Sequence, residues 1–97
     1  MTNDELIERL ANNDDEYLRF ERVENKLNAR PDVHAFLLLS QLIPDTEDMV
    51  AAAEHDEIFL CTNVERLAEV ITPEQIVELQ RCGVRYDSQS DSLAMFV

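Results

Sequence analysis

Residues 72–83 read TPEQIVELQRCG and carry the clearest local structural signal in the chain. Thr72 and Gln75 have the spacing of a capping box, in which two side chains satisfy the free backbone amides at a helix start. Pro73 suits the first helical position, and Gly83 suits the left-handed residue that follows a helix. The stretch therefore predicts a short helix with both ends defined.

The residues on either side of this helix favour strands. Residues 57–62, EIFLCT, are bulky and partly β-branched, which is typical of a strand. Residues 84–86 and 92–97 predict two more strands around the polar turn 87–91. Asn63 suits the cap of a further two-turn helix. The sequence thus predicts a small antiparallel sheet of three strands, with two short helices between the first and second strands.

The N-terminal half is predicted to be helical. The capping-box pattern Thr2–Glu5 starts a first helix, and apolar residues at helical spacing predict a second over about 14–29. Pro31 suits the start of a third helix over about 31–43, and a fourth is expected from Asp45 or Thr46 to near His55. The expected fold is α+β, in a single domain over 1–97, with about four helices before the sheet.

The chain shows the features of a soluble cytoplasmic protein. Its first ten residues, MTNDELIERL, contain acids and no apolar core of a signal peptide. The longest apolar stretch, Val33–Ile43, is too short to cross a bilayer. The two cysteines are too few for a disulfide framework, so we expect both thiols to be reduced.

The net charge of −13 is large for 97 residues. Proteins that bind nucleic acid or anionic membranes directly need basic surface to displace counterions, so the composition argues against both partners. The excess charge is concentrated in residues 31–65, which hold eight acids and no lysine or arginine. This distribution favours a protein partner with a basic surface.

Residues 44–57, PDTEDMVAAAEHDE, contain six of these acids. Unpaired carboxylates gathered on one surface steer a cationic partner and accelerate its encounter. Acids four residues apart on a helix rise by about 6 Å, which is near the spacing of phosphates along a nucleic-acid strand. The predicted partner-binding residues are Asp45, Glu47, Asp48, Glu54, Asp56 and Glu57, with Glu65 and Glu69 extending the surface.

Catalytic and metal sites receive little support. The single glycine excludes the common phosphate-binding loops, and neither Cys61 nor Cys82 has a histidine nearby in sequence. Residues 54–57, EHDE, are adjacent, whereas metal ligands on a helix converge at spacings of three or four. His34, on an otherwise apolar predicted helix, is expected to be a hydrogen-bonded structural residue. We therefore expect no catalytic residue, no metal and no cofactor.

The basic residues of the predicted second helix leave two interpretations open. Arg19, Arg22, Lys26 and Arg30 recur at spacings of three and four. They would form either an internal row of salt bridges or a contact between subunits.

Two classes of function remain. The first is a non-enzymatic acidic binding protein that engages a basic partner surface, as do many phage-encoded inhibitors of host defence, transcription or nucleic-acid-binding proteins. The second is a structural or oligomeric component whose acids only maintain solubility. Apolar residues on nearly all sides of 33–43, and on both faces of the last strand, predict a homodimer or small oligomer with Phe36, Leu39 or Phe96 near the interface.

Overall fold

The computed structural model describes residues 1–12, 15–46 and 48–96. Its described residues form four α-helices, a short 3₁₀ helix and one antiparallel sheet of four strands. In chain order these are α1 (Asn3–Ala11), η1 (Phe20–Arg22), α2 (Pro31–Leu42), β1 (Val50–Glu54), β2 (Glu57–Leu60), α3 (Val64–Val70), α4 (Pro73–Cys82), β3 (Arg85–Asp87) and β4 (Ser92–Phe96). None of the described helices is long and apolar enough to cross a membrane.

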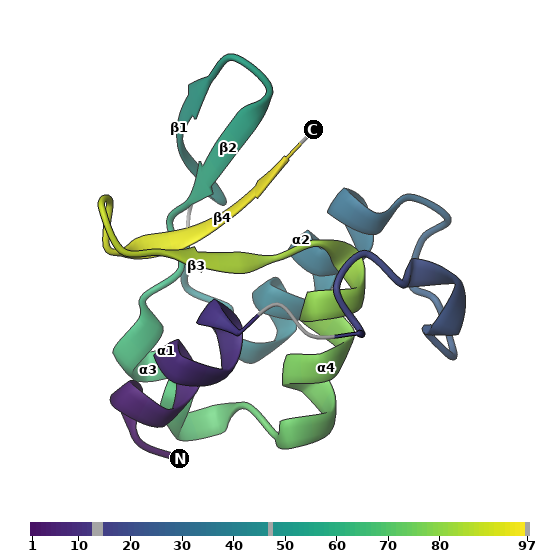
Figure 1. Ribbon diagram of the computed structural model, residues 1–97, viewed down its shortest axis with the longest axis horizontal. Coiled ribbons are helices and arrows are strands. Elements are labelled where there is room, and N and C mark those ends of the chain that lie inside the picture. The colour runs from purple at the N-terminus through teal and green to yellow at the C-terminus, as the bar shows by residue number, and fades with distance from the viewer. Residues whose placement is uncertain (13–14, 47, 97) are drawn as a thin grey trace.

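The sheet has the strand order β1-β2-β4-β3, with every neighbouring pair antiparallel. The last strand of the chain therefore lies inside the sheet, between β2 and β3. Figure 1 shows α1, α3 and α4 below the sheet, while the β1–β2 hairpin projects away from the helices. This arrangement leaves β1 at an open edge of the sheet, with four of its five residues exposed.

The two faces of the sheet differ in their contacts. Ile58 is opposite Met95, and Tyr86 is opposite Leu93, so these side chains share one face. Met95 and Leu93 are buried in the core against the helices. The other face carries Arg85, Ala94 and Phe96, by the alternation of side chains along each strand. The core is thus one layer between this sheet and the helices.

The helix over 72–83 forms as the sequence predicts. The Thr72 hydroxyl accepts a hydrogen bond from the Gln75 amide (3.2 Å), and the Gln75 side chain accepts one from the Thr72 amide (2.9 Å). Gly83 follows the helix in the left-handed conformation, with φ of 94°. The helices predicted after Thr2, after Pro31 and after Asn63 are also confirmed.

The prediction of three strands is wrong, because residues 50–54 form a strand and not the end of a fourth helix. A tight turn at His55 and Asp56 pairs this strand with β2, and His55 takes a left-handed φ of 54° for the turn. Alanine has the highest intrinsic helix propensity, but such propensities are small, and pairing with a partner strand overrides them here. Since β1 comes first, α3 and α4 lie between the second and third strands, not between the first and second as predicted.

The helix predicted over about 14–29 is also wrong in the described residues, which contain only the three-residue η1 there. Leu18 and Asn25 have positive φ values, of 63° and 52°, that do not fit an α-helix. The Leu18 amide instead donates a hydrogen bond to the carbonyl of Gln80 on α4 (3.0 Å). Contacts with other elements thus replace the bonds that a helix would make within the segment. Within the described residues, the N-terminal half therefore holds two α-helices and not the four expected.

Gly83 generates a stability prediction. A Cβ atom at this position would lie 2.7 Å from Cδ2 of Leu18, and the φ of 94° is costly for any other residue. We expect Gly83→Ala to lower the free energy of unfolding by roughly 1–2 kcal/mol, the usual cost of a left-handed residue with a side chain. Urea denaturation measures the change. Ser40→Ala, at an exposed position of α2, is the matched control, and equal stability of Gly83→Ala and the wild type would contradict the account.

Candidate protein-binding surface

Most of the cations are paired within the molecule. Six of the eight lysines and arginines lie within 4.0 Å of a carboxylate among the residues that the structure describes. The pairs are Arg19–Glu21, Arg22–Glu16, Arg30–Asp32, Arg66–Asp45, Arg81–Glu16 and Arg85–Glu57. Of the two interpretations of the basic residues at 19–30, this arrangement favours internal salt bridges.

Glu16 is held by two arginines from different parts of the chain. Its carboxylate accepts hydrogen bonds from Arg81 on α4 and from Arg22 in η1. The bond from Arg81, supported by Arg22, outweighs partial burial and lowers the pKa of Glu16. Arg81 also donates to the backbone carbonyl of Arg22 (3.2 Å). The irregular segment around residue 20 is therefore fastened to α4 by charge-assisted hydrogen bonds.

The predicted binding acids fall in two separate regions. Asp45 lies beside α3, because its carboxylate pairs with Arg66 of that helix (2.8 Å). Glu65 and Glu69 are exposed on α3 itself. Figure 1 places α3 on the other side of the sheet from the projecting β1–β2 hairpin, so Glu65 and Glu69 do not form one surface with the acids at the hairpin turn.

The hairpin carries the second group of acids. Asp48 precedes β1 and accepts a hydrogen bond from the Val50 amide (3.2 Å), while Glu54 and Asp56 are exposed at and beside the turn. None of these three acids forms an ion pair with a lysine or arginine in the part of the chain that the structure describes. We define the hairpin acids as Asp48, Glu54 and Asp56.

Two further acids of the predicted binding surface are not included among the hairpin acids. Glu57 is half-buried at the start of β2 and pairs with Arg85. The guanidinium of Arg85 also lies over the Phe96 ring, 4.6 Å from its centroid. Glu47 lies outside the described residues.

The predicted interface residues have different environments. Leu39 is completely buried in the core of the monomer, with 0% exposure, so a second chain cannot reach it in this fold. Phe36 is half-buried and packs against the same core. Phe96 is 53% exposed on the outer face of the sheet. Phe96 is therefore the accessible residue of the three.

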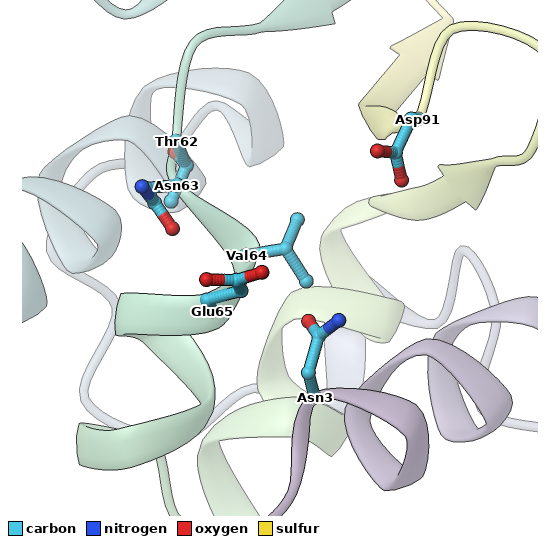
Figure 2. Close-up of a pocket in the computed structure, with 6 residues that line it drawn as sticks. All are labelled: Asn3, Thr62, Asn63, Val64, Glu65 and Asp91. Atoms are coloured by element: carbon cyan, nitrogen blue, oxygen red, sulfur yellow. The ribbon is translucent and has the colours of Figure 1, made fainter.

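A polar cleft of about 320 Å³ opens between the starts of α1 and α3 (Figure 2). It is lined by Asn3, Thr62, Asn63, Val64, Glu65 and Asp91. Two of these side chains already serve the fold, since Asn63 accepts the Arg66 amide as the cap of α3 and Asp91 accepts the Tyr86 hydroxyl. The Thr62 hydroxyl, which also lines the cleft, donates to the sulfur of Met49 (3.7 Å) and not to a carboxylate.

Metal ligands and activated thiols do not come together in the described residues. No group of three or more histidine, cysteine or acidic side chains there could hold a metal ion. Cys61 is exposed, whereas Cys82 is buried. Burial, with a smaller contribution from Glu78, raises the pKa of Cys82 to about 12, so its reactive thiolate form is scarce at neutral pH.

Comparison with known proteins yields no relative. No family model matches the sequence, and no curated protein or solved structure matches the chain.

Several of the contacts that organise this surface have no local sequence signal. Glu16 and Arg81 are separated by 65 residues, and Glu57 and Arg85 by 28. No helical or strand spacing relates such partners. The sequence could therefore indicate where acids are concentrated, but not which of them form ion pairs within the fold.

The lowered pKa of Glu16 predicts how stability responds to acid. A carboxyl group with a lowered pKa in the folded state stabilises the fold at pH 7, and this contribution is lost as the pH falls through the folded pKa. We expect Glu16→Gln to be less stable than the wild type at pH 7 and to lose less stability on acidification. Urea midpoints at pH 7 and pH 3 measure both effects. Glu24→Gln, at an exposed acid of the same segment, should match the wild type, and an identical acid response in Glu16→Gln would refute the role of the pair.

Proposed function

We propose that this protein is a non-enzymatic binding protein whose hairpin acids engage a basic surface of a protein partner. One observation carries the proposal. Most cations of the chain are paired internally, whereas Asp48, just before β1, and Glu54 and Asp56, at the turn of the projecting hairpin, are exposed without a cationic partner among the described residues.

The shape of the hairpin supports access by a partner. Between Asp48 and Glu54, residues 51–53 are three exposed alanines. Their short side chains let an opposing surface approach the carboxylates without displacing bulky groups. The hairpin also projects from the body of the protein, so a partner can contact it from more than one side (Figure 1).

The charge of the whole molecule supports fast and selective encounter. A net charge of −13 attracts a basic surface over roughly the Debye length, about 10 Å at 0.1 M salt, and repels nucleic acid. A basic surface that ordinarily binds nucleic acid is the class of partner that fits this field. Occupying such a surface would inhibit the partner, as expected of a small acidic inhibitor of a host protein.

Charge reversal of the hairpin tests the proposal. The wild type and the variant Asp48→Lys/Glu54→Lys/Asp56→Lys are immobilised, and proteins captured from a lysate of the native host are compared at low and high salt. We expect the wild type to capture a basic protein whose binding weakens as ionic strength rises, and the variant to lose it, because like charges then face each other. Calorimetry with the purified partner gives the affinities.

A second variant separates local from overall charge. Glu8→Lys/Asp15→Lys/Glu24→Lys reverses three exposed acids outside the hairpin, so its net charge is the same. It should retain most of the affinity. Equal binding by the hairpin variant and the wild type would show that the hairpin acids only maintain solubility.

A further inference from the structure

Residues 15–30 form a strap across α2 and α4. Apart from η1 the strap has no regular structure, so its position depends on individual contacts. Near its start, Glu16 binds Arg81, and the Leu18 amide binds the Gln80 carbonyl. Near its end, the Leu27 amide donates a hydrogen bond to Nδ1 of His34 on α2 (3.0 Å). Figure 1 shows the strap at the side of the molecule, next to these helices.

His34 has both ring nitrogens engaged and is only 1% exposed. Since Nδ1 accepts the Leu27 amide proton, it carries no proton of its own. The ring proton is therefore on Nε2, which donates to the Glu78 carboxylate of α4 at 2.8 Å. The neutral ring thus joins three parts of the chain: the strap, α2 and α4.

We propose that His34 is a proton-sensitive latch that releases the later part of the strap when it is protonated. A second proton can bind only at Nδ1, because Nε2 already carries one. The new N–H would face the N–H of Leu27, so that hydrogen bond is lost. The bond from Nε2 to Glu78 remains and becomes an ion pair. One proton therefore detaches the strap while it strengthens the link between α2 and α4.

The surroundings of His34 contain charges of both signs. Glu78 contacts the ring directly, and the neighbouring cleft of about 340 Å³ is also lined by Glu24, Glu74 and Arg81. On the strap side, the Phe20 ring packs edge-on against His34 with its centroid 5.8 Å away, and Lys26 lies over that ring. The backbone carbonyl of Arg30, whose side chain pairs with Asp32, accepts the His34 amide.

The start of the strap is held by the ion pair between Glu16 and Arg81, which responds differently to pH. The arginine contacts lower the pKa of Glu16, so its carboxylate stays charged at pH values where histidine ordinarily takes up a proton. Residues around Glu16 and Leu18 are then still held on α4 when Leu27 is released. The opening part is the end of the strap, from Val23 to Ala29, while Arg30 stays in place at the start of α2.

Opening would uncover an apolar part of the fold. Val23 is buried and lines the same cleft as Leu38 of α2. The closed form carries no proton on Nδ1 and the open form carries one, so the closed form loses stability as the pH falls. For one proton, the ratio of closed to open molecules changes by up to about tenfold per pH unit.

Hydrogen exchange followed by NMR tests the latch from pH 8 to pH 5, with rates corrected for the intrinsic pH dependence of exchange. We expect the protection of the Leu27 amide to fall as the pH falls, by up to about tenfold per pH unit, and the His34 ring to take up its second proton only as the strap opens. The Leu18 amide and the amides of α2 should keep their protection. Loss of protection across the whole chain would indicate general unfolding and overturn the proposal.

The two histidines of the chain provide matched variants. His34→Gln can accept from Leu27 and donate to Glu78 without titrating, so its Leu27 protection should be independent of pH. His55→Gln, at the exposed turn of the hairpin, should keep the response of the wild type. The same response in His34→Gln would overturn the proposal. If His34→Gln does not fold, the wild type still tests the proposal. A protonated His34 ring with the Leu27 amide still protected, or Leu27 protection that does not change with pH, would also overturn it.

Discussion

A shortage of cations is the constraint on which this structure depends. The chain has eight lysines and arginines for twenty-one acids. Three arginines each join segments that are distant in sequence. Arg81 binds Glu16 and fastens the strap to α4, Arg66 binds Asp45 and joins α3 to the loop before β1, and Arg85 on β3 reaches across β4 to Glu57 on β2. The cations thus hold irregular or peripheral segments, and most of the remaining acids that the structure describes are exposed.

The arginine ion pairs fix where these segments lie, but they contribute little to the free energy of unfolding. Exposed ion pairs contribute about 0–1 kcal/mol each, so the main stabilising contribution comes from the apolar core. That core draws fully buried residues from helices and sheet alike: Leu6, Leu10, Leu39, Leu60, Leu67, Leu79 and Leu93. The strap adds little to it beyond the buried Val23 and the partly buried Phe20, so polar contacts set where the strap lies. The hairpin beyond the core is held by strand pairing, and its acids stay accessible.

The sequence predicts elements whose signals are local and fails where distant contacts decide. The ends of α4 follow from Thr72, Gln75 and Gly83, which act on their own helix, and the buried face of α1 follows from helical spacing. β1 could not be predicted, because alanines favour strand only when a partner strand is present. The sequence wrongly predicts a helix for the strap because Phe20 and Val23 have helical spacing. In the structure, Glu16 and Leu18 bind α4 instead. The acids of the candidate surface are visible in the sequence, but the neutralisation of Asp45 and Glu57 is not.

The most direct test of the account is to map the surface that the captured partner covers. Backbone amide signals of the isotope-labelled protein, recorded with and without the purified partner, report each contact. The account predicts that the amide signals of residues 48–56 shift when the partner is added, while those of α1 and the strap do not shift. Changes confined to the outer sheet face around Phe96, with the hairpin unaffected, would contradict it and favour an apolar interface instead.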